Sequence, residues 1–369
     1  MTLLPATIDD LARLNFAQER GTVIGAVSDR SVEICPSYLL TDDDLKAAFG
    51  EAVLIRDGQV SCTDEWLLDG FGFIRDAVIV QGFGEADKSL DQAEQLALSL
   101  ADNAPRAVVV MGSGSLINVI TYAVAQLPMI EQVTVIPTNA MSIADVAYGG
   151  LGMVNDRAKN DRRQERDPDL IILSAPVFTS APSSQHWQGQ IEVVKHLMFQ
   201  RDGDNEAKIE SLLTAPGQCS PDDLFASAVQ GLKLNIMLRY AIRDGVPAAK
   251  DVLNFGHAIA HGIETISDYT VAHADAVRFG LAVDCYDQRS DLTALLCHQP
   301  WSPDLLSAVD RLLALSDHQF IEQVEAKYKR HDKLRVLRPA IHAYPYQIGD
   351  DLMAFDRVRD VIGFLRSAH

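Results

Sequence analysis

Three histidines fall within one short region of the chain and could serve as metal ligands or proton carriers. His257 and His261 lie four residues apart in LNFGHAIAHGIE (253–264), whose apolar spacing predicts a helix. Residues at this spacing share one helical face. His273 follows in VAHADAVRFG. The pattern fits a metal site, a catalytic base or a polar patch on a buried helix, and these residues alone do not choose among the three.

A carboxylate that could complete a metal site lies further upstream. GQIEVVKH (189–196) carries Glu192 and Lys195 three residues apart, on one face of a predicted helix. One carboxylate and two imidazoles, such as Glu192 with His257 and His273, suit zinc with an open coordination position, which polarises a hydroxyl or a carbonyl. Histidines at this spacing also occur as core or capping residues. The segments are far apart in sequence, so only the fold can show whether they converge.

A glycine-rich turn in AVVVMGSGSLINVI joins a predicted strand to a predicted helix. Gly112 and Gly114 let the backbone approach a ligand closely, and the N–H groups and dipole of the helix start favour a diphosphate. The turn lacks the third glycine of the usual dinucleotide fingerprint, so a simple strand-to-helix turn is an equal alternative. Upstream, GFGEADKSL places Glu85 and Lys88 before a helix, where taken alone they indicate a capped helix start.

Composition limits the class of protein and its partners. The 369 residues suffice for two domains and a large core, and 47% apolar and 22% charged residues are ordinary for a globular protein. The net charge of −19 argues against nucleic acid or an anionic membrane as partner, because phosphate groups bind clustered Lys and Arg. The five cysteines form no CxxC pair, and we find neither a signal peptide nor an apolar run of about 18 residues. We therefore expect a cytoplasmic protein without a transmembrane segment.

The first 180 residues alternate short apolar runs with helical spacing, which predicts a parallel sheet with crossover helices. The segment FAQERGTVIGAVSDRSVEICPS is expected to form hairpin strands at the edge of this sheet, and the charged residues 160–169 to form a solvated loop. Buried strands are predicted at 52–56, 77–81, 107–111 and 133–137, and helices at 89–103 and 115–127.

The pattern changes after about residue 183. Six segments, from GQIEVVKHLMF to HQFIEQVEAKYKR, show apolar periods near 3.6. The Ser/Pro-rich stretch TSAPSSQHWQ (179–188) is the predicted boundary. We expect an α/β domain over residues 1–182 and a mostly α-helical domain over residues 183–369.

Six segments, taken in order, resemble the motifs of the sugar phosphate cyclases, the superfamily of 3-dehydroquinate synthase. The resemblance runs from about residue 50 to residue 338 and covers most of the chain. One such motif would be weak, whereas six in register are specific for the superfamily. The segments are GEADKSL, MGSGSLINV, IPTNAMSIADVAYGG, VNDRAKN, GQIEVVKH, and LNFGHAIAHGIE followed by HADAV.

The resemblance implies a dehydroquinate synthase-like fold with a Rossmann-like NAD-binding domain at residues 1–182 and a helical metal- and substrate-binding domain at residues 183–369. It implies NAD and one divalent metal, usually zinc, although Glu/His₂ ligation also suits Co²⁺ or Fe²⁺. The implied metal ligands are Glu192, His257 and His273.

The resemblance also assigns residues around the metal and the cofactor. His261 becomes a catalytic group or substrate contact outside the metal's own ligands, and Asp57, after a predicted strand, becomes a ligand of the adenosine ribose. The other implied substrate-site residues are Lys195, Asn254, Lys159, Asn160, Asp145, Lys233, Lys250 and Lys329. The other implied cofactor-binding residues are Glu85, Lys88, Gly112, Ser113, Gly114, Asn118, Thr138 and Asn139.

The implied reaction is a series of steps on one bound sugar phosphate. Hydride passes from a secondary alcohol to NAD⁺ while the metal stabilises the alkoxide, and the resulting ketone acidifies the neighbouring C–H so that phosphate is eliminated. The hydride then returns, the ring opens, and an intramolecular aldol step closes a carbocycle. NAD is regenerated within each turnover.

Several residues depart from the family pattern. Leu151 stands where the family has an active-site lysine after Gly-Gly, and Asn118 stands in place of an aspartate. The segment AQLPMIEQ lacks an arginine that helps to bind phosphate. Losing one such cation from a desolvated phosphate site costs about 2–5 kcal/mol if nothing compensates. We therefore expect a divergent paralogue, in secondary metabolism, that acts on a different or less highly phosphorylated sugar.

Two other functions stay open. A metal-dependent NAD alcohol or polyol dehydrogenase has the same architecture, and the loss of phosphate ligands would suit an unphosphorylated polyol. A non-catalytic protein could have kept the scaffold, although a full metal triad with Lys195 and Asn254 argues against it. A dehydrogenase accumulates NADH, whereas a cyclase shows no net NADH and releases phosphate. The family implies a homodimer that acts on a small sugar or sugar phosphate.

Overall fold

The computed structural model divides the chain into two compact units, each described here by itself. The first unit comprises Met1–Gly189 with Ser220–Arg243, and the second comprises Gln190–Cys219 with Asp244–His369. This division differs from the predicted boundary between residues 182 and 183, because residues 220–243 pack with the first unit; as a boundary between domains, 182/183 stays a prediction. The structure describes residues 15–61, 64–80, 83–157, 159–199, 203–214, 219–245, 247–286, 290–316, 318–320, 329–330, 333–339 and 348–367.

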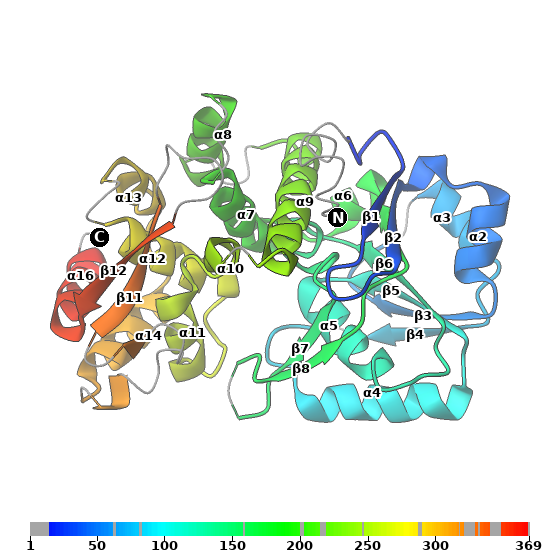
Figure 1. Ribbon diagram of the computed structural model, residues 1–369, viewed down its shortest axis with the longest axis horizontal. Coiled ribbons are helices and arrows are strands. Elements are labelled where there is room, and N and C mark those ends of the chain that lie inside the picture. Colours follow the sequence, from blue (N-terminus) through cyan, green and yellow to red (C-terminus); the bar gives the residue numbers. More distant parts are fainter. Residues whose placement is uncertain are drawn as a thin grey trace. The chain divides into compact units, whose positions relative to one another are not determined.

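A seven-stranded sheet lies at the centre of the first unit, in the order β1-β2-β9-β6-β5-β3-β4 (Figure 1). Neighbouring strands are parallel except β1 and β2, which form an antiparallel hairpin at one edge. The predicted parallel sheet and edge hairpin are thus confirmed. The strands are β1 Gly21–Ile24, β2 Ser31–Pro36, β3 Ala52–Asp57, β4 Asp76–Val80, β5 Ala107–Gly112, β6 Gln132–Pro137 and β9 Leu170–Leu173.

Burial along the strands follows their position in the sheet. Every residue of the central strand β5 is buried, as expected for a Val-rich parallel strand covered on both faces. The edge strand β4 is mostly exposed within the structure, and Ile79 is 50% accessible to solvent. The prediction of a buried strand at 77–81 was therefore wrong about burial, because an apolar run does not reveal which strand will lie at an edge.

Helices connect the parallel strands as crossovers. The connection from β3 to β4 runs away from β1 in the sheet, whereas the connections from β4 to β5 and from β5 to β6 run back toward β1. Because such crossovers are right-handed, α4 and α5 pack together on one face of the sheet, whereas α2 and α3 pack together on the other (Figure 1). The helices are α2 Asp42–Phe49, α3 Glu65–Phe71, α4 Leu90–Asn103, α5 Gly114–Val124 and α6 Ala175–Ser180, with a 3₁₀ turn η1 at Ser37–Leu39.

The carboxyl ends of β3 and β5 meet at the point where the direction of these connections reverses. Arg56 pairs with Met111, so the next residues, Asp57 and Gly112, lie side by side at this edge. In doubly wound sheets, ligands bind in the crevice outside the strand ends at this point. The topology therefore positions Asp57 and the glycine-rich turn before α5 as parts of one edge.

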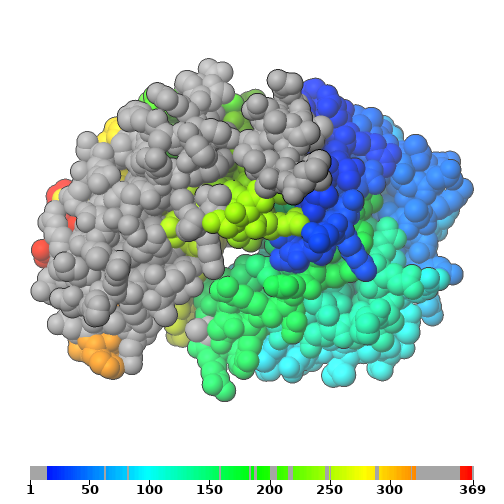
Figure 2. All heavy atoms as spheres, viewed as in Figure 1, coloured from blue at the N-terminus to red at the C-terminus, as the bar shows by residue number. Residues whose placement is uncertain are grey.

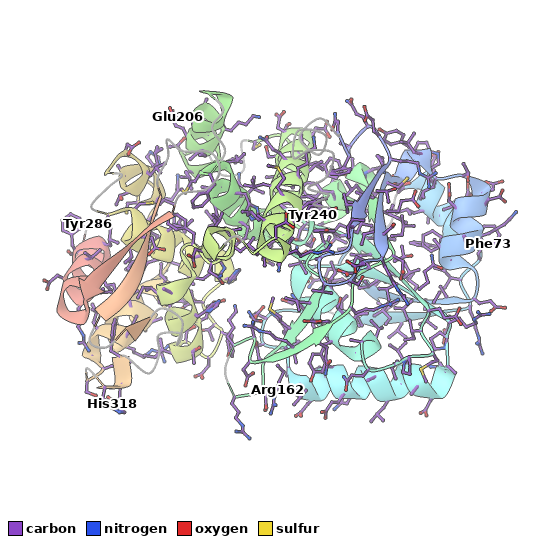
Figure 3. All side chains as sticks on the ribbon, in the orientation of Figure 1. Phe73, Arg162, Glu206, Tyr240, Tyr286 and His318 are labelled. Carbon is purple, nitrogen blue, oxygen red and sulfur yellow. The ribbon has the colours of Figure 1, made fainter. Side chains whose placement is uncertain are left out.

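Two smaller elements of the first unit pack against α5. One is the π-helical segment η2 (Ser142–Val146), which also contacts α9 (Pro221–Arg243). The other is an antiparallel hairpin of β7 (Leu151–Val154) and β8 (Arg162–Glu165), with Arg162 at its outer end in Figure 3. The strand β8 corrects the expectation of a loop at 160–169. Its mostly exposed side chains carry the charge, while its backbone pairs with β7, and charge alone does not reveal that pairing.

Helix α9 also holds the edge hairpin of the first unit. The Tyr240 hydroxyl accepts a hydrogen bond from the Ile24 backbone N–H at 2.5 Å, and Figure 3 shows Tyr240 on α9 beside β1. Arg243 donates to the Gly25 carbonyl at 2.7 Å and pairs with Asp29. The blue hairpin residues and the yellow-green end of α9 lie together on the face shown in Figure 2.

The second unit is mostly helical, as predicted, and also contains an antiparallel three-stranded sheet that the sequence did not indicate. Its strands are β10 Lys329–Arg330, β11 Lys333–Pro339 and β12 Ile348–Ala354. Strand β10 corrects the end of the predicted helix HQFIEQVEAKYKR, most of which lies outside the described residues. Helix α7 (Ser183–Leu197) enters this unit from Gln190 onward. The other helices are α8 Gly203–Thr214, α10 Pro247–Leu253, α11 His257–Ile266, α12 His273–Cys285, α13 Ser290–Leu296, α14 Pro303–Ala314 and α16 Phe355–Ser367.

Across the described residues of both units, every helix is too short or too polar to serve as a membrane span.

Candidate metal centre and cofactor-binding edge

Three helices of the second unit bring Glu192, His257 and His273 to one point. Glu192 lies on α7, whereas His257 and His273 are the first residues of α11 and α12. Oε1 of Glu192 lies 3.5 Å from Nε2 of His257 and 3.4 Å from Nε2 of His273. One ligand atom from each residue lies within 4.8 Å of the other two. The three segments therefore converge, with the spacing that a shared cation requires.

A pair of glycines sets how closely the two histidine-bearing helices approach. Gly256, just before α11, adopts a left-handed conformation with φ of 77° and donates its N–H to Asp284 of α12 at 2.8 Å. A β-carbon on Gly280 of α12 would overlap the carbonyl oxygen of Gly256. Only glycine at position 280 allows this contact, which fixes the starts of α11 and α12 relative to each other.

The second nitrogen of each histidine fixes which nitrogen faces Glu192. Nδ1 of His257 lies 2.9 Å from the carbonyl oxygen of Phe255, and Nδ1 of His273 lies 2.9 Å from Oε1 of the buried Glu264. A carbonyl and a carboxylate only accept, so each Nδ1 carries the proton and each Nε2 presents a lone pair. Lone pairs on both Nε2 atoms thus face a Glu192 oxygen that makes no hydrogen bond within the described structure. The lone pairs of the two nitrogens and the carboxylate oxygen repel one another unless a cation lies between them, so the three residues fit a divalent metal.

Lys195 sets the charge state of the triad. Its Nζ pairs with Oε2 of Glu192 and donates to the Leu253 carbonyl at 3.0 Å, and both side chains are almost fully buried. Burial raises the pKa of the Glu192 carboxyl, but the Lys195 ammonium acts most strongly against burial, and the pKa is held well below its usual range. Burial, followed by the Lys195 charge, lowers the pKa of His257 well below its usual value. At neutral pH the structure therefore presents a carboxylate and a neutral imidazole, the forms that bind metal.

The other residues predicted for the substrate site lie on several elements of the two units. The half-buried His261 lies one turn along α11, with its ring 5.3 Å from the His257 ring. Asn254 lies in the turn before α11, and its carbonyl accepts the His257 N–H at 3.0 Å. Lys233 lies on α9 in the first unit, where burial lowers its pKa. The backbones of Lys250 and Lys329 lie in α10 and β10, but their side chains are outside the described part of the structure.

A polar network in the first unit joins residues that the sequence assigned to cofactor and substrate separately. Oε1 of Glu85 lies 3.5 Å from Nζ of Lys88 and 3.3 Å from Nζ of Lys159. Lys88 also donates to Oδ1 of Asn160 at 2.6 Å, and Ser115 of the glycine-rich turn donates to Glu85 at 3.1 Å. Both lysine side chains are at most 5% exposed. Two buried ammonium groups thus gather around the carboxylate of Glu85, next to the glycine-rich turn.

The strand ends of the first unit present buried polar atoms at the edge where Asp57 meets the glycine-rich turn. Oδ2 of Asp57 and the hydroxyls of Ser113 and Thr138 are buried and have no hydrogen-bond partner within the described residues. Thr138 follows β6, and its N–H donates to the Gly112 carbonyl at 3.2 Å. Buried polar groups normally find partners, so three unpartnered ones near one sheet edge indicate a polar ligand.

Two of the predicted cofactor-binding residues use their side chains in hydrogen bonds to the protein backbone. Asn118 donates to the Gly114 carbonyl at 3.0 Å and accepts from the Met153 N–H at 3.1 Å, which ties α5 to β7. Asn139 accepts from the Ser142 N–H at 2.8 Å and caps the start of η2. Both side chains therefore have a structural role in the described residues.

Asp145 lies on η2, and a residue that the sequence did not single out holds it there. Nδ2 of Asn235 on α9 donates to the carbonyls of Ala144 and Asp145, at 3.0 and 2.8 Å.

Glu264, the partner of His273, was also missed. Its only signal was a carboxylate on the same predicted helix as His257, seven residues further on, where a buried acid needs a partner.

Comparisons with known proteins agree with this geometry. Residues 190–296 match the family model of the 3-dehydroquinate synthase C-terminal region. The 3-dehydroquinate synthase of Aeropyrum pernix is 29% identical over 208 residues, which are 55% of this chain and 56% of that protein. The chain thus spans little more than half the length of this relative.

Two solved structures share the fold. The crystal structure of 2-deoxy-scyllo-inosose synthase complexed with carbaglucose-6-phosphate, NAD⁺ and Co²⁺ has a TM-score of 0.69 at 18% identity, and the match covers 93% of this chain and 99% of that one. The 2-epi-5-epi-valiolone synthase from Streptomyces hygroscopicus subsp. jinggangensis 5008, with NAD⁺ and Zn²⁺ bound, has a TM-score of 0.63 at 17% identity and covers 89% of this chain and 94% of that one. The region matched by the family model includes the three metal-bearing segments, so this part of the chain is similar to the 3-dehydroquinate synthase C-terminal region, and the chain as a whole shares the fold of these two cyclases.

Proposed function

We propose that the protein is an NAD- and divalent-metal-dependent cyclase that converts a sugar phosphate into a carbocycle. The proposed course is transient oxidation, phosphate elimination, re-reduction and intramolecular aldol closure, which makes the enzyme a carbon–oxygen lyase. One observation carries the proposal: two imidazole Nε2 lone pairs and a buried carboxylate oxygen face a common point on α7, α11 and α12. The similarity to 3-dehydroquinate synthases supports the reaction class.

Different residues of the chain would bind the metal and the nucleotide. Glu192, His257 and His273 would hold the metal, and Asp57 with the turn at Gly112–Gly114 would hold the nucleotide. When bound, the metal would supply a Lewis acid at the reacting alcohol, and NAD would supply a reversible hydride acceptor. Zn²⁺ or Co²⁺ is the proposed metal, because related structures hold these ions and the ligand set suits both.

Proton transfer and charge control would fall to residues around the triad. His261 would move a proton to and from the substrate, since its half-buried ring lies one helical turn beyond His257. Lys195, held by the Leu253 carbonyl, would keep Glu192 ionised. In the first unit, Lys88 and Lys159 would favour the anionic groups of cofactor or substrate, because both buried ammonium groups lie beside Glu85, which Ser115 of the glycine-rich turn also contacts.

The departures from the family pattern support a more specific proposal. Leu151 carries no charge where the family has a lysine, so a substrate with fewer or differently placed anionic groups suits the chain. We assign the protein to secondary metabolism on this ground. We also propose that it acts as a homodimer, as the family implies. A cytoplasmic location is proposed because Cys35 and Cys297 are thiols, which a reducing compartment preserves.

A polyol dehydrogenase is the second candidate. The same triad and NAD-binding edge would serve a single hydride transfer, and an uncharged residue at Leu151 suits an unphosphorylated polyol. In this reading the substrate leaves after oxidation, and NADH accumulates.

The two candidates are separated by one assay. Metal-loaded protein is incubated with NAD⁺ and a panel of phosphorylated and free C6–C7 sugars, and mass spectrometry, phosphate release and NADH absorbance are recorded together. We expect a cyclised product and inorganic phosphate without net NADH. NADH formed in proportion to an unphosphorylated substrate would instead establish the dehydrogenase. Glu192→Gln serves as the metal-site control and should abolish either activity; activity unaffected by this change or by a chelator would refute both candidates.

A further inference from the structure

Arg239 on α9 is a half-buried cation that makes no ion pair with the described residues of the first unit. Its Nε donates to Oδ1 of Asn235 at 3.2 Å. Within the described residues, its two Nη groups make neither a hydrogen bond nor an ion pair. Burial lowers the pKa of Arg239, although Asp145, Tyr148 and Asp167 nearby act against that shift. Arginine nevertheless stays protonated in proteins, so the charge persists in a partly desolvated place.

The polar groups around Arg239 are already engaged elsewhere. Both oxygens of Asp167 accept backbone N–H groups of Val27 and Ser28, at 2.7 to 3.2 Å. The Tyr148 hydroxyl donates to the Ile24 carbonyl. These groups lower the electrostatic cost of the cation without satisfying the donors of its guanidinium. The Nη groups are not among the buried unpartnered atoms of the described structure, so they stay accessible, and an anionic ligand could replace water as their partner.

The position of Arg239 indicates which part of a ligand it would meet. A β-carbon on Gly149 would lie 3.8 Å from Nη2 of Arg239, so the guanidinium lies beside Gly149, the first residue of the Gly149–Gly150 pair. That pair directly precedes Leu151, where the expected lysine is missing. Asn235, the partner of Nε, also holds the backbone of Asp145 on η2. Arg239 therefore belongs to the same local structure as Asp145 and Leu151, although it comes from a different helix.

We propose that Arg239 forms a binding subsite for an oxyanion of the substrate, a carboxylate or a phosphate, and supplies the positive charge that Leu151 does not. The inference rests on the proposed function, because it takes the Asp145 segment as part of the substrate site. The free end of a guanidinium presents parallel N–H donors that bind a planar or tetrahedral oxyanion in a bidentate manner. A lysine at position 151 would offer a point charge instead, so the subsite selects the orientation of the anion as well as its charge.

The test compares Arg239→Gln and Arg239→Lys with the wild-type chain and with Arg243→Gln. Arg243 lies one turn further along α9 and pairs with Asp29 and the Gly25 carbonyl, so it controls for loss of an arginine on this helix. The probes are inorganic phosphate and malonate, each compared with sodium chloride at the same ionic strength, and the readout is the midpoint of thermal unfolding.

We expect one of the two probes to raise the midpoint of the wild type and of Arg243→Gln, with Arg239→Lys shifted less and Arg239→Gln not at all. The effective probe identifies phosphate or carboxylate as the natural group. An equal shift in wild type and Arg239→Gln, or no shift with either probe, would overturn the subsite. Should Arg239→Gln fail to fold, Arg239→Lys decides, because a full shift in that variant contradicts bidentate binding.

The same proteins separate this inference from the proposed function. With any sugar that the panel assay turns over, Arg239→Gln should raise KM about tenfold or more for the charged substrate. Metal and NAD⁺ binding should stay unchanged. Turnover with an unchanged KM would refute the subsite and leave the enzyme assignment intact. Anion binding that depends on Arg239 in a protein without metal-dependent turnover would do the reverse.

Discussion

Nδ1 of His273 donates to Oε1 of Glu264 at 2.9 Å, and this bond turns Nε2 of the imidazole toward Glu192. Glu264 is 1% exposed and lies on α11, two turns beyond His257. One helix therefore supplies both a predicted metal ligand and the carboxylate that orients another. Such partners fix the ring orientation and increase the basicity of the coordinating nitrogen.

We expect Glu264→Gln to weaken metal binding by about ten- to a hundredfold, because the amide is a poorer acceptor and no longer increases the basicity of His273. Competition with a chromogenic chelator measures the affinity for Zn²⁺ and Co²⁺. Thr265→Ala, at the next position of the same helix, removes only a bond to the His261 carbonyl and serves as the control. Unchanged affinity in Glu264→Gln would show that Glu264 does not position the ligand.

The sequence allowed the metal set to be predicted because its residue types are few and its segments follow a known order. The structure places the three groups within reach of one cation, which periodicity could not establish. Glu264, Asn235 and Arg239 were not predicted, because each gains its role from a distance between side chains on different elements. A glutamate, an asparagine or an arginine on a predicted helix is usually a surface residue, and the sequence alone does not reveal the contacts that give it another role.

The fold, too, could be predicted only where the local sequence determines the structure. Apolar runs predicted the strands at 107–111 and 133–137, since such runs reflect burial on both faces of a parallel sheet. The exposed edge strand β4 and the charged strand β8 follow from pairing partners that the local sequence does not specify.

Asp44 gives the first unit a pH-dependent contribution to stability. Hydrogen bonds from Arg20, and then from Thr41, lower the pKa of Asp44. A carboxyl whose folded-state pKa is lowered stabilises the fold above its unfolded pKa of about 3.9, and that stability is lost as the pH falls toward the folded-state value. We expect the difference in unfolding free energy between wild type and Asp44→Asn to be largest near neutral pH and to shrink steadily below about pH 4.

Denaturant unfolding at a series of pH values measures this difference. Asp43→Asn, in the same first helical turn, should keep the wild-type pH dependence, because the exposed Asp43 side chain makes neither a hydrogen bond nor an ion pair with the described residues. A pH-independent gap between wild type and Asp44→Asn would contradict the assignment.

Lys195 stabilises a charge that the metal would also stabilise, so its removal should depend on the metal. In the metal-free protein, Lys195→Met leaves the buried Glu192 carboxylate without its ammonium partner, and we expect a loss of about 3–5 kcal/mol in unfolding free energy. With saturating Zn²⁺ the loss should be smaller, because the cation then compensates the same carboxylate. Urea unfolding with Zn²⁺ or with a chelator gives both values, and an identical loss in the two conditions would place the metal away from Glu192.

Gly280 links the packing of α11 and α12 to metal binding. A methyl group at this position would overlap the Gly256 carbonyl, so Gly280→Ala must separate the two helices that begin with His257 and His273. We expect lower stability and, because the two Nε2 atoms move apart, at least tenfold weaker metal binding. Gly363→Ala on α16 is the matched control. No described atom lies within 4 Å of its added β-carbon, and better helix propensity should stabilise that variant by about 0.5–1 kcal/mol. Thermal unfolding and chelator competition on both variants test the link. If Gly280→Ala lost stability but kept full metal affinity, the spacing of α11 and α12 would not control the metal centre.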